Sequence, residues 1–427
     1  MPTQLQFLLS RLRERLWVKP VIACVLSVAG VLLAHLADAV EVDWQIPEIA
    51  QGSVIDLLKI VAASMLGVAT FAVASMVGAY SSAGQSATAR AFPLVVADDV
   101  SQNALSIFVG AFIFSIVALS ATTNDYFGKA GRFTLFVLTL LTLASVVLVF
   151  VRWVDRIARL GRLGAVIDKV EQATAEALAR RRQEPWLGGR PASGAAAGLA
   201  LHGSASGHLQ SIDMAALQRI ARKNGFSLTL AVLPGALVTP SRPLAYVLPD
   251  APDSGPIDPA PLRKAFIVGP VRRFDDDPRF GLVVLSEIAC RALSPAVNDS
   301  GTAIGILGTL YRLFADWSKP CTPEAPRHDR IAVPALSVDD MFDDVFPAIA
   351  RDGAALVEVG VRLQRVLGDL GRCDDAPLHA AAARHAALAM ARARRVLDFP
   401  PDLAQLEGRY AAYWAADAAQ DGGRRPS

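Results

Sequence analysis

The chain contains few charged residues, no paired cysteines and only a small excess of positive charge. Charged residues make up 19% of its 427 residues, whereas about a quarter is usual in soluble proteins. The net charge of +2 is too small to indicate a nucleic acid or another polyanion as a partner. No CxxC spacing occurs among the four cysteines, which are Cys24, Cys290, Cys321 and Cys373. The pattern argues against a disulfide framework or a zinc site and favours reduced thiols.

The common signatures of catalysis are also missing. The sequence has no nucleophile elbow, Walker loop, dinucleotide fingerprint or HExxH motif. Its nearest approach to a metal site is the run Asp275-Asp276-Asp277, but Asp277 before Pro278 is equally typical of a helix N-cap. We favour the cap, because carboxylates that directly follow one another rarely converge on one ion. We expect no cofactor and no metal.

Long apolar runs occur only in the first 151 residues. A membrane-spanning helix needs about 20 mostly apolar residues. Four stretches meet this requirement, namely Pro20–Val40, Ile55–Tyr80, Ala104–Ala121 and Phe133–Val151. The sequence therefore predicts an α-helical membrane protein with four transmembrane helices, followed by a cytosolic α+β region.

The distribution of lysine and arginine predicts the orientation of these spans. The first loop contains Glu41, Asp43 and Glu48 but no basic residue. Basic residues instead precede the first span and follow the fourth; they are Arg11, Arg13, Arg15, Lys19, Arg152, Arg156, Arg159 and Arg162. Both termini are therefore expected in the cytoplasm. The first span also resembles a signal peptide ending at Ala37-Asp38-Ala39, although its length favours an uncleaved anchor.

Polar residues near the ends of the spans are candidate functional groups. His35 and Asp38 share a helix face, and so do Asp56 and Lys59. Ionisable groups inside a membrane usually have a function, but near a helix end they can also reach headgroups or one another. Between the second and third spans, Gln85 and Arg90 could hold an anionic headgroup or substrate. Arg90 is equally typical of a positive-inside anchor.

Small residues recur four positions apart in two spans. The pairs are Ala63/Gly67 and Ala74/Gly78 in the second span and Ser106/Gly110 in the third. Such faces let helices approach closely. They indicate either tight packing within one chain or a weakly polar path through an oligomer.

Composition and periodicity divide the chain into seven segments. We expect a basic amphipathic lead-in over 1–19, a four-helix membrane domain over 20–151 and a stalk helix over 152–183 that continues the fourth span. A Gly-, Pro-, Ala- and Ser-rich linker follows over 184–206, then a small α/β unit over 207–248. A mainly helical domain over 249–420, opening with a helix from Asp258 to Gly269, and a disordered tail over 421–427 complete the chain.

The turn between two predicted helices, Ser294 to Ala303, is a candidate ligand-binding site. Asn298 or Asp299 is expected to cap the second helix, where free N–H groups and the Ser300 and Thr302 hydroxyls could hold an anion. Arg279 and its neighbours Arg272 and Arg273 could add positive charge. The alternative is a helical hairpin whose turn satisfies its own backbone.

The stretch Ala292-Leu293-Ser294-Pro295-Ala296-Val297-Asn298-Asp299-Ser300-Gly301-Thr302-Ala303 resembles the signature of a bacterial family of predicted membrane proteins, domain of unknown function 2254. Four N-terminal spans, the loop with Gln85 and Arg90, and the segment His208–Asp213 agree with it. The resemblance implies a multi-pass protein of the bacterial inner membrane and carries no activity that can be transferred.

Three functions are compatible with these patterns. The preferred one is an oligomeric channel or transporter-like protein gated by its cytosolic domain, with the bilayer and further copies of the chain as partners. The second is a membrane-anchored sensor or scaffold that binds a small anion or protein through the 294–303 turn. The third is a lipid- or envelope-modifying enzyme that uses Arg90 and the Asp275–Asp277 run at the inner face.

Overall fold

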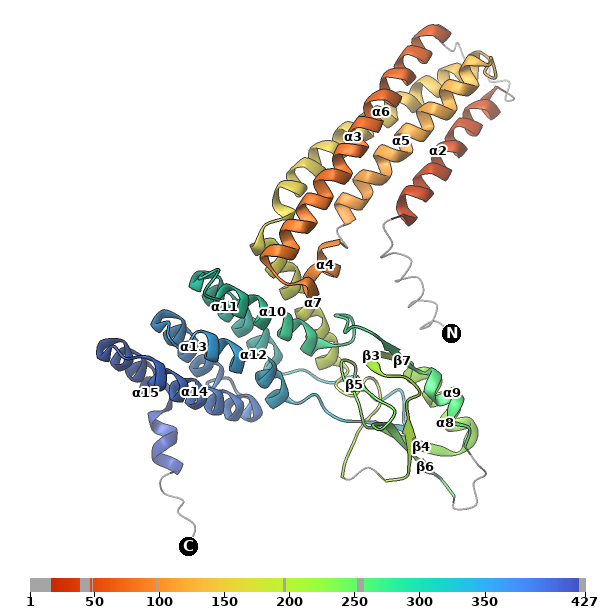
Figure 1. Ribbon diagram of the computed structural model, residues 1–427. Coiled ribbons are helices and arrows are strands. Elements are labelled where there is room, and N and C mark those ends of the chain that lie inside the picture. Colours follow the sequence, from red (N-terminus) through yellow and green to blue (C-terminus); the bar gives the residue numbers. More distant parts are fainter. Residues whose placement is uncertain are drawn as a thin grey trace. The chain divides into compact units, whose positions relative to one another are not determined.

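The computed structural model describes residues 17–38, 47, 49–96, 99–194, 197–251 and 257–421 (Figure 1). The chain divides into two compact units, Met1–Val166 and Ile167–Ser427, which we call the membrane unit and the C-terminal unit. The expected lead-in over 1–19 and tail over 421–427 lie almost entirely outside the described residues.

Four long helices of the membrane unit confirm the four predicted spans. They are α2 (Val18–Ala37), α3 (Gln51–Ser86), α5 (Asp99–Thr123) and α6 (Lys129–Leu160). Each is long and apolar enough to cross a bilayer. Helix α5 contacts the other three and is the most buried of the four. Between α3 and α5 the chain forms a 3₁₀ turn, η1 (Ala89–Ala91), and a short helix, α4 (Phe92–Val96).

The fourth span does not continue into one uninterrupted stalk. Helix α6 extends past the predicted end of the span to Leu160, and its Trp153 is fully buried against Phe108 and Phe150. The helix then ends at Gly161, and α7 begins at Leu163 and runs to Gln183. Glycine is the weakest helix former after proline, which accounts for a break at this position.

Two small sheets form the β part of the C-terminal unit. The larger sheet has the strand order β1 (Arg190–Pro191), β8 (Ile331–Val333), β4 (Phe226–Leu230), β6 (Pro243–Pro249), β2 (Leu199–His202). The smaller sheet has the order β5 (Leu237–Val238), β3 (Gly207–Ile212), β7 (Phe266–Gly269). Their core also includes α8 (Met214–Asn224) and α9 (Pro259–Lys264).

These pairings change the segment boundaries expected from the sequence. The stretch 184–206, expected as a linker, contains β1 and β2, which pair with β8 and β6. The helix expected from Asp258 to Gly269 ends at Lys264, and Phe266–Gly269 forms β7 beside β3. Residues from the expected helical domain thus complete both sheets. Local composition does not reveal such pairing, because the partner strands are distant in sequence.

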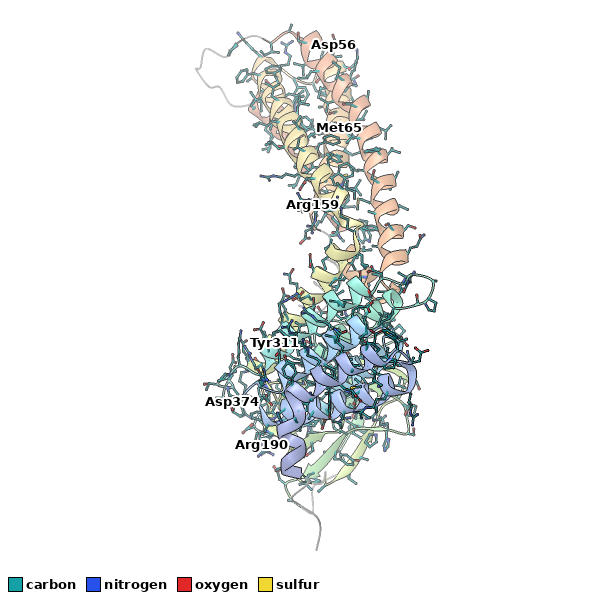
Figure 2. The ribbon with its side chains drawn as sticks, turned by 90° about the vertical axis from the view of Figure 1, so that its left-hand side faces the viewer. Asp56, Met65, Arg159, Arg190, Tyr311 and Asp374 are labelled. Atoms are coloured by element: carbon teal, nitrogen blue, oxygen red, sulfur yellow. The ribbon has the colours of Figure 1, made fainter. Side chains whose placement is uncertain are left out.

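The remaining helices form two rows (Figure 1), and neighbours within a row run parallel, since Arg279 of α10 contacts Asp340 and Ser286 contacts Val345 of α12. One row contains α10 (Pro278–Ala292), α12 (Val338–Asp352) and α14 (Ala376–Val396). The other contains α11 (Ser300–Trp317), α13 (Val357–Leu370) and α15 (Pro400–Asp421). Figure 2 shows Tyr311 on this helical part and Arg190 on β1. Arg182 of α7 donates to the main-chain oxygen of Asp316, so the last part of α7 packs beside the end of α11.

Candidate functional site

The turn between α10 and α11 satisfies its own hydrogen-bonding groups. The Asp299 carboxylate accepts from the Thr302 N–H at 2.9 Å and from the Thr302 hydroxyl at 2.6 Å. The N–H of Asn298, which has φ of 50°, donates to the Ser294 carbonyl, and the Ser294 hydroxyl donates to the Arg291 carbonyl. The two hydrogen bonds from Thr302 lower the pKa of Asp299. A carboxylate therefore already lies where an anion would bind, which favours the helical-hairpin alternative.

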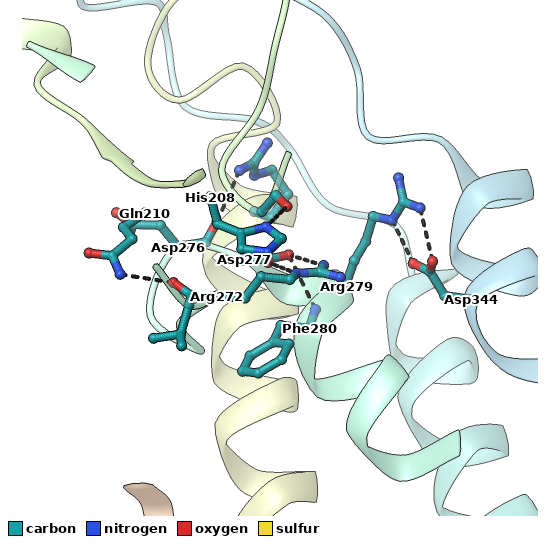
Figure 3. Close-up of polar contacts among 11 residues, drawn as sticks. His208, Gln210, Arg272, Asp276, Asp277, Arg279, Phe280 and Asp344 are labelled. Carbon is teal, nitrogen blue, oxygen red and sulfur yellow. Dashed lines mark hydrogen bonds and ion pairs between the residues drawn. The ribbon is translucent and has the colours of Figure 1, made fainter. Parts of the chain in front are cut away.

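The structure does not bring Arg279 to this turn. Arg279 lies in the first turn of α10, and Ser294 comes two residues after the last residue of that helix. At 1.5 Å per residue the two are about 20 Å apart along the axis. Arg279 instead binds Asp344 through two nitrogen atoms, at 2.6 and 3.0 Å (Figure 3). Its third nitrogen atom binds Asp340. Two carboxylates of α12 thus neutralise the charge of Arg279.

The turn provides a first prediction, the substitution Asp299→Ala. Loss of the cap is expected to lower the free energy of unfolding by about 1 kcal/mol, as for other N-caps. Chemical denaturation of the full chain in detergent measures this change. Asp316→Ala on the same helix is the matched control, because the Asp316 carboxylate is exposed and, among the described residues, is bonded only to Lys319. A loss in Asp299→Ala no larger than in this control would contradict the capping role.

The aspartate run before α10 forms separate ion pairs and hydrogen bonds. Asp277 caps α10 by accepting from the Phe280 N–H, and Arg272 binds the same carboxylate through two nitrogen atoms at 2.7 and 3.0 Å. Asp275 pairs with Arg273, while Asp276 accepts from Arg181 through its main-chain oxygen. Among the described residues there is no group of three side chains suited to a metal ion. The geometry favours the capping interpretation.

Asp277 forms a buried contact with a distant turn of the chain, and the sequence alone did not indicate this contact (Figure 3). The Asp277 side chain is 3% exposed, and the backbone of Gly235 lies directly against its carboxylate. Gly235 has φ of 94° and its carbonyl lies 3.4 Å from a His208 ring nitrogen. We call Arg272, Asp277 and Gly235 the joint. It ties the loop before α10 to the turn between β4 and β5.

The polar residues at the ends of the spans hold the membrane unit together. The Asp38 carboxylate accepts from the Gly128 N–H at 2.8 Å and from the Gly131 N–H at 2.7 Å, so it caps α6. His35 lies 3.0 Å from the Tyr126 carbonyl. His35 and Asp38 therefore bind the same connection between α5 and α6. Asp56 and Lys59 are both exposed and form an ion pair of 3.5 Å.

The small residues of α5 pack within the chain. A side chain added at Gly110 would lie 3.1 Å from Ala23 of α2, and the Gly110 carbonyl accepts from the Ser27 hydroxyl. Ser106 is buried, and its hydroxyl donates to the Gln102 carbonyl of its own helix. Gly110 thus serves close packing of α2 on α5, while Ser106 is buried one turn away on α5.

One set of small residues on α3 faces away from the rest of the described chain, whereas others such as Ala72 are buried. A side chain added at Gly67 or Gly78 would meet no atom within 4 Å. Residues on this side are exposed at three- or four-residue intervals along the helix. We call them the α3 small face; they are Ala63, Ser64, Gly67, Thr70, Ala74, Gly78 and Ser81. Nothing in the described part of the chain covers this face.

A hollow of about 520 Å³ lies where the α3 small face ends. Val77, Tyr80, Ser81 and Gly84 of α3 line it together with Ala89 and Phe92, and the lining is mostly apolar. Gln85 lies next to Gly84 and its side chain is 3.3 Å from the Ser81 hydroxyl. Arg90 is exposed in η1, one residue from the hollow's edge at Ala89. The structure therefore brings Gln85 and Arg90 to the rim of one hollow.

Comparison with known proteins identifies the family. A family model described as a predicted membrane protein, domain of unknown function 2254, matches residues 13–369. Similar proteins include uncharacterized proteins of Mycobacterium bovis and Mycobacterium tuberculosis, each 32% identical over 130 residues. The aligned part is 29% of this chain, which spans about a quarter (25%) of the length of these relatives. No solved structure matches the chain. Because the family model covers most of the sequence, the chain belongs to this family of predicted membrane proteins.

Proposed function

We propose that the protein is a subunit of an oligomeric, channel- or transporter-like assembly in the bacterial inner membrane. The observation that carries the proposal is the uncovered α3 small face. Its small residues are those through which membrane helices approach one another closely. Because no described residue covers this face, its occupant is a second copy of α3 in a symmetric assembly.

The other exposed helix faces support this assignment by contrast. Most exposed residues of α2 and α6 are large and aliphatic, as with Leu26 on α2 and Leu148 on α6, whereas α3 exposes its small face beside large residues such as Phe71. Lipid chains solvate large aliphatic surfaces well. The α3 small face also carries the Ser64 and Thr70 hydroxyls, which donate to carbonyls of their own helix. Their oxygens can still accept hydrogen bonds, so a path beside them would be weakly polar.

The two alternatives have less support from the geometry. The 294–303 turn, proposed for a sensor or scaffold, holds its own carboxylate at the helix terminus. The Asp275–Asp277 run, proposed for an enzyme, forms ion pairs and a helix cap. In the preferred function the C-terminal unit would gate the path, because it is a large region attached to the membrane spans.

The decisive variant is Gly67→Leu. A leucine in the centre of the α3 small face would hold two helices apart, so we expect smaller assemblies by native mass spectrometry. In proteoliposomes, ion or solute flux should fall about tenfold or more, which corresponds to losing about 1.4 kcal/mol of assembly free energy. Gly30→Leu on α2 is the matched control. A carbon added at Gly30 would also meet no atom within 4 Å, but Gly30 lies among large residues.

A second control separates a shared path from general damage to the spans. Ser106→Ala should leave flux unchanged, because Ser106 is buried inside one chain. A wild-type protein that is monomeric in its native lipids would contradict the proposal. So would equal flux and equal stoichiometry in the wild type and in Gly67→Leu.

A further inference from the structure

Arg362 of α13 carries a positive charge that no described residue neutralises. Its side chain is partly buried, and its Nε atom is shielded from solvent without a hydrogen-bond partner in the described part of the chain. No described carboxylate forms an ion pair with it, including Glu358 one turn earlier on the same helix. An unmade hydrogen bond at a buried charged donor is costly. An acceptor from outside the chain would therefore bind Arg362 favourably.

Gly308 of α11 leaves space beside this guanidinium. A carbon added at Gly308 would lie 3.4 Å from Nη2 of Arg362 and 4.0 Å from Nη1 of Arg312. Apart from the residues that flank Gly308, no other described side chain comes within 4 Å of that point. The two nitrogen atoms are thus less than about 8 Å apart, a gap that one oxyanion can bridge with N–H···O bonds of about 2.9 Å.

Arg312 is fixed in position while one of its nitrogen atoms remains available. Glu171 of α7 accepts hydrogen bonds from Nε at 2.8 Å and from Nη2 at 2.7 Å, and Nη2 also donates to the Thr309 hydroxyl. No described residue bonds to Nη1. Glu171 and the nearby Asp168 offset the charge of Arg312, so Arg362 supplies the net attraction for an anion. A guanidinium that is already fixed loses little freedom on binding.

We propose that Arg362 and Nη1 of Arg312 bind a phosphate group over Gly308. Arginine N–H groups form strong, charge-assisted hydrogen bonds to phosphate oxygens. The place is open enough for a larger molecule that carries the phosphate, because Arg312 is 58% exposed and Gly305, one turn earlier on α11, is also exposed. The site is separate from the 294–303 turn and does not depend on the oligomer proposed above.

The test compares melting temperatures of the full-length protein in lipid-free detergent with inorganic phosphate or with chloride at the same ionic strength. Phosphate should raise the melting temperature of the wild type by mass action. Arg362→Gln should bind phosphate at least about tenfold more weakly, because it removes a charge-assisted hydrogen bond. In chloride this variant should melt no lower than the wild type, since the charge that it removes has no partner in the described chain.

Two matched controls separate the site from general effects of charge and size. Arg395→Gln removes an exposed arginine of α14 in the other row, and phosphate should stabilise this variant as much as the wild type. Gly308→Leu keeps both arginines but fills the space between them, so phosphate binding should be lost. Gly408→Leu on α15, where an added carbon meets no atom within 4 Å, should bind phosphate normally.

Short-chain phosphatidylglycerol in the same assay distinguishes the source of the phosphate. If a lipid supplies the group, the difference in stabilisation between the wild type and Arg362→Gln should be larger with phosphatidylglycerol than with phosphate. If a soluble molecule supplies it, phosphate should give the larger difference. Equal stabilisation of Arg362→Gln and the wild type by both ligands would overturn the proposal. So would a wild type that neither ligand stabilises.

Discussion

Replacing Asp277 by alanine is expected to cost about 3–5 kcal/mol of unfolding free energy, the usual result of removing one partner of a buried ion pair. The substitution leaves the Arg272 guanidinium, which is 21% exposed, without its carboxylate partner. It also removes the cap on the Phe280 N–H. The melting temperature of the C-terminal unit should fall by about 10 °C or more, measured by circular dichroism on the full chain.

Two further variants separate the contributions of charge and cap. Asp277→Asn keeps a good N-cap, so the loss that remains in this variant reports the ion pair with Arg272. Asp275→Ala is the matched control from the same run, because the Asp275 side chain is 71% exposed. Its melting temperature should change by no more than 1–2 °C, as at ordinary surface positions. Equal melting temperatures in Asp277→Ala and Asp275→Ala would refute the role of the joint.

Gly281→Ala is expected to destabilise the C-terminal unit by about 1–3 kcal/mol or more, because it overpacks a buried contact. Gly281 lies on α10, directly against Thr174 of α7, and an added carbon would overlap the threonine hydroxyl. Thr174 cannot easily move, since it is 1% exposed and its hydroxyl bonds to the Val170 carbonyl at 2.6 Å. Denaturant unfolding of the full chain measures the change.

The same experiment contains its own tests. Gly305→Ala is the control on α11. The carbon added there would meet no atom within 4 Å, so the substitution should stabilise the helix by about 0.5–1 kcal/mol. Combining Gly281→Ala with Thr174→Ala should cost less than the sum of the two single changes, because part of the overlap is removed. If the two changes add without any coupling, the close approach of α10 to α7 is not the cause of the loss.

Much of the architecture could be predicted from the sequence, because its causes are local. The four spans follow from the lengths of the apolar runs and the thickness of a bilayer. Helix starts at Asp213, Asp258, Asp277 and Asp299 follow from side chains that bond to an N–H two or three residues later. The family resemblance also rested on contiguous residues near Asn298, and the family model confirms it.

The tertiary structure decided everything that depends on distant partners. Arg279, expected beside the 294–303 turn, lies at the other end of α10, and Asp38 proves to cap a helix some 90 residues later. Strands in the apparent linker, and β7 within an expected helix, exist because β6, β8 and β3 are there to pair with them. Sequence spacing also could not distinguish Gly110, which packs against Ala23, from Gly67, which faces outward. The sequence by itself determined the spans, the caps and the family. Only the fold decided which polar groups are satisfied and which small residues remain uncovered, because those properties arise between segments that are far apart in the chain.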